Sequence, residues 1–143
     1  YLELARKVME TTAALQEGIR SIPELEIMSN PEMSVFAYRS TSKKVNIYAV
    51  GDQMEEKGWL VDRLQRPEAL HAMVTPLHER ITDQFILDLK HSVEKVKSDP
   101  SLAKKGNAAL YGMIAKVPLR GMIKIEVLKM MEQIYGPEMK MPY

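Results

Sequence analysis

The spacing of apolar residues changes along this chain, and that change limits its possible folds more than any other feature. Residues 1–20 and 81–99 place apolar side chains three or four positions apart, which predicts amphipathic helices. The apolar stripe of the second helix, the strongest in the chain, consists of Ile81, Phe85, Leu89, Val93 and Val96. Pro23 and Pro100 follow the two segments, and proline ends a helix because it lacks an amide hydrogen and blocks the preceding turn.

Between these helices the period shortens to two, which is typical of half-buried strands. ELEIM (24–28) and MSVFAYRS (33–40) predict an edge strand and a second strand, separated by an Asn-Pro turn. WLVDRLQ (59–65) and ALHAMVT (69–75) predict an antiparallel pair in the same sheet.

The remaining segments complete an α+β pattern. NIYAVGDQMEEKG (46–58) predicts a helix, 101–106 a polar loop, 107–115 a short helix, and 120–135 a last helix stopped by a Gly-Pro pair. This order predicts an α+β fold, with a small, mostly antiparallel sheet covered on one face by helices and free on the other.

Composition excludes several classes of function. A length of 143 residues suits one domain, and a net charge of +1 gives no basic surface for a nucleic-acid partner. The absence of cysteine excludes disulfides and zinc–sulfur sites, and no apolar run approaches the roughly 20 residues that a membrane span needs. The text begins with Tyr1 inside a helical pattern, so we expect a fragment whose upstream part is missing.

Few residues of the chain suggest chemistry by themselves. His71, His78 and His91 match no common metal spacing, so a structural or surface role is the simpler interpretation, with His78 left open at a strand-to-helix junction. Arg39 and Arg120 are single arginines and weak indications of an anion site. No nucleophile elbow, P-loop or dinucleotide motif occurs. The residues alone therefore indicate a scaffold without a self-sufficient active site.

The segment GNAALYGM (106–113) is unusual because it spends two glycines and a tyrosine near the end of a small domain. Gly106 and Gly112 would let the backbone approach another group closely. Tyr111 can donate a hydrogen bond or relay a proton, although a packed aromatic on a short helix is the simpler interpretation from the residues alone.

Four segments together resemble one enzyme family: SNPEMSVFAYRS, NIYAVGDQMEEKGW, LQRPEALHAMVTPLH and NAALYGM. Their order and separation are similar to those in the C-terminal domain of the sphingosine-1-phosphate lyases, fold-type I pyridoxal-phosphate enzymes of the group II decarboxylase type. The likeness runs to about Met113, some four fifths of the chain. It implies that 1–143 is a C-terminal small domain, with 101–143 as a helical extension within it.

The resemblance also implies a cofactor, partners and one site residue. A large domain upstream would hold pyridoxal 5′-phosphate on a lysine that follows a histidine; no His-Lys pair occurs here, so this fragment should be inactive alone. The parent would cleave phosphorylated sphingoid bases by retro-aldol cleavage to a long-chain aldehyde and phosphoethanolamine. It would be a homodimer with a phosphorylated lipid-like substrate, cytoplasmic or on the cytosolic face of the endoplasmic reticulum if eukaryotic. Tyr111 would be the catalytic residue that reaches the cofactor and substrate pocket.

Two other interpretations remain. The chain could be the small domain of a pyridoxal-phosphate-dependent amino-acid decarboxylase, which would release carbon dioxide. It could also be an independent α+β interaction module. The apparent upstream truncation and the uncovered sheet face argue against an independent module.

Overall fold

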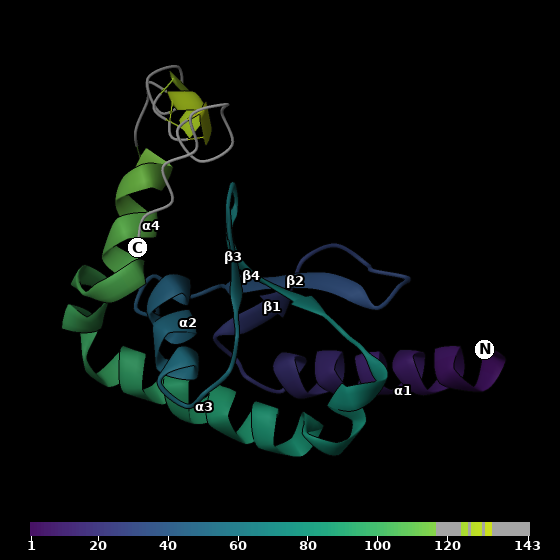
Figure 1. Cartoon of the computed structure of the whole chain (residues 1–143). Coiled ribbons are helices and arrows are strands. Elements are labelled where there is room, and N and C mark those ends of the chain that lie inside the picture. The colour runs from purple at the N-terminus through teal and green to yellow at the C-terminus, as the bar shows by residue number, and fades with distance from the viewer. Residues whose placement is uncertain (117–123, 126, 130, 133–143) are drawn as a thin grey trace.

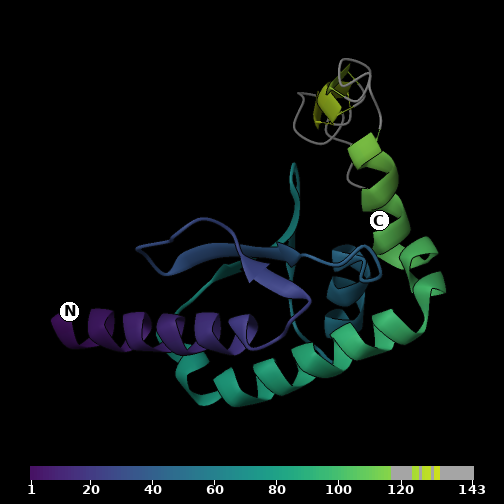
Figure 2. The same ribbon diagram turned by 180° about the vertical axis from the view of Figure 1, so that it is seen from behind.

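The computed structural model describes residues 1–116, 124–125, 127–129 and 131–132. Its elements in chain order are α1 (Leu2–Arg20), β1 (Leu25–Ile27), β2 (Val35–Ser40), α2 (Ile47–Glu55), β3 (Asp62–Gln65), β4 (Glu68–Met73), the 3-10 helix η1 (Pro76–Arg80), α3 (Thr82–Ser98), the 3-10 helix η2 (Pro100–Lys104) and α4 (Gly106–Lys116). Figure 1 and the reverse view in Figure 2 show α1 and α3 along one side of the sheet, with α2 packed against both α3 and α4.

The four strands form one antiparallel sheet in the order β1-β2-β4-β3. The register pairs Val35 with Met73 and Asp62 with His71. The expected antiparallel pair is confirmed as β3 and β4, and β1 is the edge strand that its short alternating sequence predicts. The α+β fold class follows.

Strand alternation and helical spacing send their apolar residues into one core. Phe36 and Tyr38 of β2 are buried on the face of the sheet that the helices cover. Val35 alternates with them and is exposed on the opposite face. The largest buried apolar side chains of this core are Ile19, Tyr38, Tyr48, Val50, Met54, Leu70, Leu89, Val93 and Val96. Each such burial contributes about 1.5–3 kcal/mol relative to an exposed side chain.

Two details differ from the sequence-based expectations. Ile81 is 37% exposed rather than part of the buried stripe, because it precedes α3 as the N-cap residue. The expected loop 101–106 is mostly the 3-10 helix η2, which begins where the Asp99 side chain accepts a hydrogen bond from the Ser101 amide. Arg120 and most of the expected last helix over 120–135 lie outside the described residues.

Among the residues described, we find no helix with both the length and the apolar composition that crossing a membrane requires.

Candidate functional site

Tyr111, the residue singled out in the sequence, lies half-buried on α4. Its ring packs on the ring of Tyr48 in α2, with centroids 5.6 Å apart and planes tilted by 45°. The guanidinium carbon of Arg63 in β3 stands 5.6 Å from the centroid of the same ring. This distance is within the range of a cation–π interaction. Within the described part of the chain, the Tyr111 hydroxyl makes no hydrogen bond.

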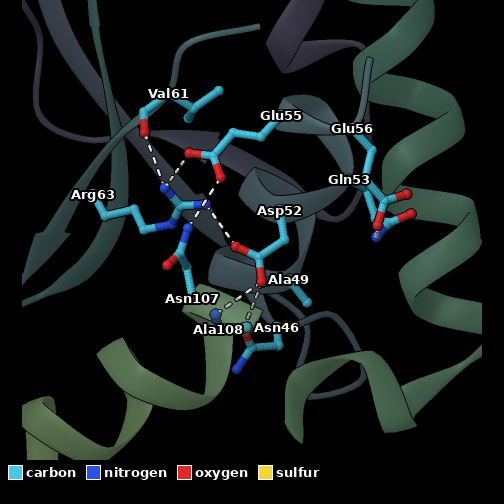
Figure 3. A network of polar contacts seen from close by, with 10 residues as sticks. All are labelled: Asn46, Ala49, Asp52, Gln53, Glu55, Glu56, Val61, Arg63, Asn107 and Ala108. Atoms are coloured by element: carbon cyan, nitrogen blue, oxygen red, sulfur yellow. Dashed lines mark hydrogen bonds and ion pairs between the residues drawn. The ribbon is translucent and has the colours of Figure 1, made fainter. Parts of the chain in front are cut away.

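Arg63 is held by two carboxylates of α2 (Figure 3). Its Nη2 donates to Oδ1 of Asp52 at 2.6 Å, and its Nη1 donates to Oε1 of Glu55 at 2.6 Å. Nη1 also donates to the Val61 carbonyl at 3.2 Å. The arginine side chain is only 5% exposed, so these bonds replace its hydration.

Arg63, Asp52 and Glu55, together with the rings of Tyr48 and Tyr111, form one cluster, and its opposite charges stabilise one another. The hydrogen bond from Arg63 lowers the pKa of Glu55 and outweighs burial, which acts in the opposite direction; the arginine's charge and Asn107 lower this pKa further. Burial would lower the pKa of Arg63, but the hydrogen bonds and charges of Glu55 and Asp52 outweigh it and raise that pKa. Glu55 and Arg63 are therefore both charged at neutral pH.

The start of α4 is tied to the same two carboxylates. The Ala108 amide donates to Oδ2 of Asp52 at 2.9 Å, and Nδ2 of Asn107 donates to Oε2 of Glu55 at 3.2 Å. Gly106 has a φ of 53°, and a Cβ there would lie 2.8 Å from Oδ2 of Asp52. Close approach at this glycine is thus explained by the contact with α2.

Gly112 differs from Gly106 in its surroundings. A Cβ at Gly112 would meet no atom within 4 Å, so no close approach among the described residues requires this glycine. Gly112 lies inside α4, and its expected approach to a group outside this chain stays a prediction.

Tyr48 is a member of the cluster that sequence reasoning missed. Its hydroxyl donates to the Leu64 carbonyl at 2.6 Å, which joins α2 to β3. Burial, followed by the nearby charges of Glu68 and Tyr111, raises the pKa of Tyr48 to about 12. Tyr48 is therefore a neutral hydrogen-bond donor with a structural role. In the sequence, its place near the start of a predicted helix was the one feature that could have drawn attention to it.

Two of the three histidines, and Arg39, have local partners. Nδ1 of His78 accepts a hydrogen bond from the Thr75 amide at 2.8 Å and so caps η1. His71 lies 3.8 Å from the Asp62 carboxylate, and His91 is exposed. Arg39 donates to Glu26 at 2.5 Å on the sheet.

Metal and cofactor sites have little support from the described residues. No group of three or more His, Cys, Asp or Glu side chains in that part of the chain could hold a metal ion. A cavity of about 190 Å³ between the sheet and the start of α3 is lined by residues that include Trp59, His71, His78 and Phe85, but by no lysine. These residues therefore do not fit a cofactor that must be tethered by a lysine.

Comparison with known proteins follows this geometry. No family model matches the chain. Sphingosine-1-phosphate lyase of Arabidopsis thaliana is 38% identical over 135 residues, which are 94% of this chain and 24% of the relative. The protein of the same name from Oryza sativa subsp. japonica is 40% identical over 132 residues, 92% of this chain and 24% of the relative. The solved structure of a Burkholderia pseudomallei sphingosine-1-phosphate lyase is similar with a TM-score of 0.64 and 34% identity, over 72% of this chain and 23% of that one.

These similarities show which proteins the chain is related to. The structural match confirms the expected α+β fold of the fold-type I kind. The chain is homologous to part of the sphingosine-1-phosphate lyases, and the sequence similarity reaches beyond the four fifths expected. It spans about a quarter of the length of the curated relatives it matches.

Proposed function

We propose that the chain is the C-terminal small domain of a pyridoxal-phosphate-dependent lyase that acts on phosphorylated sphingoid bases. The observation that carries this proposal is the identity of 38–40% over more than nine tenths of the chain to proteins named sphingosine-1-phosphate lyase. Because the chain covers only about 24% of those relatives, a large domain of the same polypeptide would supply the rest of the active site.

The proposed reaction is a retro-aldol cleavage. The bond between Cα and Cβ breaks, and its electron pair stays with Cα. The C3 hydroxyl loses its proton as its carbon becomes the long-chain aldehyde. Cα then gains a proton, which leaves phosphoethanolamine. Pyridoxal 5′-phosphate in the large domain would supply the electron sink for this cleavage. The chain contains no His-Lys pair, so we expect it to be inactive by itself.

Tyr111 is the residue of this chain that we place in the active site. Its ring is fixed by Tyr48 and Arg63, which supports a stable position for the hydroxyl. The hydroxyl makes no hydrogen bond within the described residues, so it is available to a group outside them. It would donate a hydrogen bond to the substrate phosphate or relay a proton.

The family resemblance also supports the assembly and location that we propose. The parent would be a homodimer, and it would be cytoplasmic or lie on the cytosolic face of the endoplasmic reticulum in a eukaryote. The parent would act on a lipid-like phosphorylated substrate. The names of the relatives support this substrate, whereas the net charge of +1 does not bear on it.

The decisive experiment uses the purified full-length gene product that contains this chain. We expect it to retain pyridoxal 5′-phosphate and to release long-chain aldehyde and phosphoethanolamine from a phosphorylated sphingoid base. Release of carbon dioxide from an amino acid, without aldehyde, would support the decarboxylase instead. A product with neither bound cofactor nor either activity would leave the interaction module as the better interpretation.

Replacing Tyr111 with phenylalanine tests the role of its hydroxyl. We expect Tyr111→Phe to lower kcat by about 10²-fold, because a positioned proton donor typically contributes at least that much. The control is Tyr38→Phe, which removes the hydroxyl of a tyrosine buried in the core. Unchanged kcat in Tyr111→Phe with cofactor bound would contradict the role.

A further inference from the structure

The guanidinium carbon of Arg63 lies over the ring of Tyr111, 5.6 Å from its centroid. Arg63 also shares its two carboxylate partners with the first residues of α4, the helix that carries Tyr111 (Figure 3). We infer that Arg63 is a positioning residue for Tyr111, which fixes the hydroxyl at the active site of the parent enzyme. This inference rests on the proposed function and adds to it a residue with a stated task.

Each carboxylate bridges Arg63 to the first turn of α4. Asp52 accepts from Arg63 with Oδ1 and from the Ala108 amide with Oδ2. Glu55 accepts from Arg63 with Oε1 and from the Asn107 side chain with Oε2. A shift of the guanidinium therefore moves the acceptors that hold the start of α4.

Tyr111 follows Ala108 by about one helical turn, so it lies on the same side of α4 as the bridged amide. The bridges hold the helix, and the face of the Tyr111 ring then meets the Arg63 guanidinium. Tyr48 contacts the ring too, and its hydroxyl is bonded to Leu64, the residue next to Arg63 in β3. Strand β3 thus anchors both groups that contact the tyrosine ring.

Stability alone is a weak reason for this arrangement. Burying an ion pair removes hydration from both charges, and apolar residues of similar size often stabilise a fold equally well. In addition, Nε of Arg63 is buried without a hydrogen-bond partner among the described residues. The planar, forked guanidinium is suited to bridge two carboxylates and to stack on a ring at once, and a lysine ammonium cannot do both.

The test uses the full-length holoenzyme and the variant Arg63→Lys. We expect kcat to fall roughly tenfold with KM changed less than about twofold, since small misplacements of a reacting group slow turnover strongly. Cofactor content should not change. Arg39→Lys is the matched control, because Arg39 forms an exposed ion pair with Glu26 on the same sheet and should leave kcat unchanged.

A double-mutant cycle separates positioning from general stability. If Arg63 acts through the hydroxyl, Arg63→Lys should have almost no further effect on kcat in the Tyr111→Phe background. An equal loss of kcat in both backgrounds, or no loss in the wild-type background, would overturn the inference. Should Arg63→Lys fail to fold, Glu55→Gln weakens the same bridge, and the identical cycle with Tyr111→Phe then decides.

The outcomes also distinguish this inference from the proposed function. A wild-type holoenzyme without aldehyde release refutes the proposed function, and the inference falls with it. A wild-type enzyme that releases aldehyde but tolerates Tyr111→Phe leaves the proposed reaction intact, and it overturns the role of Tyr111 together with this inference. If Tyr111→Phe lowers kcat but Arg63→Lys does not, the inference alone is overturned.

Discussion

At the scale of single residues, the Asp88 carboxylate shows how one acidic side chain can organise an aromatic pair. Its Oδ2 accepts from Trp59 Nε1 at 3.0 Å, and its Oδ1 accepts from Lys57 at 3.0 Å. The rings of Trp59 and Phe85 pack in a T-shaped arrangement, with centroids 5.1 Å apart and planes at 88°. Trp59 is thus a half-buried ring that packs against the core while its polar nitrogen is satisfied.

Asp88→Asn tests this carboxylate through the pH dependence of stability. Hydrogen bonds from Gln84 and Trp59, with help from Lys57 and against burial, lower the pKa of Asp88 from 3.8 to about 2. A pKa lowered in the folded state adds stability above the unfolded pKa, and that stability is lost as the pH falls from about 4 to about 2. In urea unfolding, the variant should lose about 1–3 kcal/mol at pH 7 and show a weaker decline of the free energy of unfolding below pH 4.

The control for this prediction is Glu32→Gln, an exposed carboxylate in a turn. It should leave both the stability at pH 7 and the decline below pH 4 as in the wild type. Parallel pH curves for Asp88→Asn and the wild type would contradict the role of Asp88.

Among the helices and strands, those predicted most accurately from the sequence are the ones whose apolar spacing is regular over several turns or residues. The helices at 1–20 and 81–99 and the strand pair at 59–75 were predicted correctly, because burial of one face imposes a period over several turns or residues. The 3-10 helix η2 was missed because one short turn has no period to read. Tyr111 was singled out, but Arg63 and Tyr48 were not, since their contacts join elements far apart in the sequence.

The start of α4 gives a prediction at this scale. Gly106→Ala should weaken the docking of α4 by about 1–3 kcal/mol, because alanine strains at a φ of 53° and its Cβ would displace the Asp52 carboxylate from the Ala108 amide. Hydrogen exchange should report faster exchange of the α4 amides, with α1 amides unchanged.

Gly112→Ala is the matched control for that change. The new Cβ meets nothing within 4 Å in the middle of α4, so this variant should stabilise the helix by roughly 0.5–1 kcal/mol. If both alanine variants changed the exchange of the α4 amides in the same direction, the special conformation of Gly106 would not be what fixes the helix.

At the scale of the whole molecule, the helices cover one face of the sheet and leave part of the other open. Val35 and Met73 are cross-strand partners on the open face and are 45% and 63% exposed. The order of helices and strands in the sequence predicted a sheet with one open face. It could not predict which apolar pair stays exposed, because that depends on the register between β2 and β4.

From this exposed pair we predict that the 143-residue chain associates with itself when it is studied in isolation. Neighbouring exposed apolar side chains on a sheet favour association, so the chain should self-associate in sedimentation velocity as its concentration rises. Met73→Lys places a charge on the face and should weaken that association several-fold. Leu77→Lys changes an 82% exposed leucine on η1, away from the sheet, and should leave the association constant as in the wild type. Equal effects of the two lysine variants would show that general charge, and not the open face of the sheet, governs association.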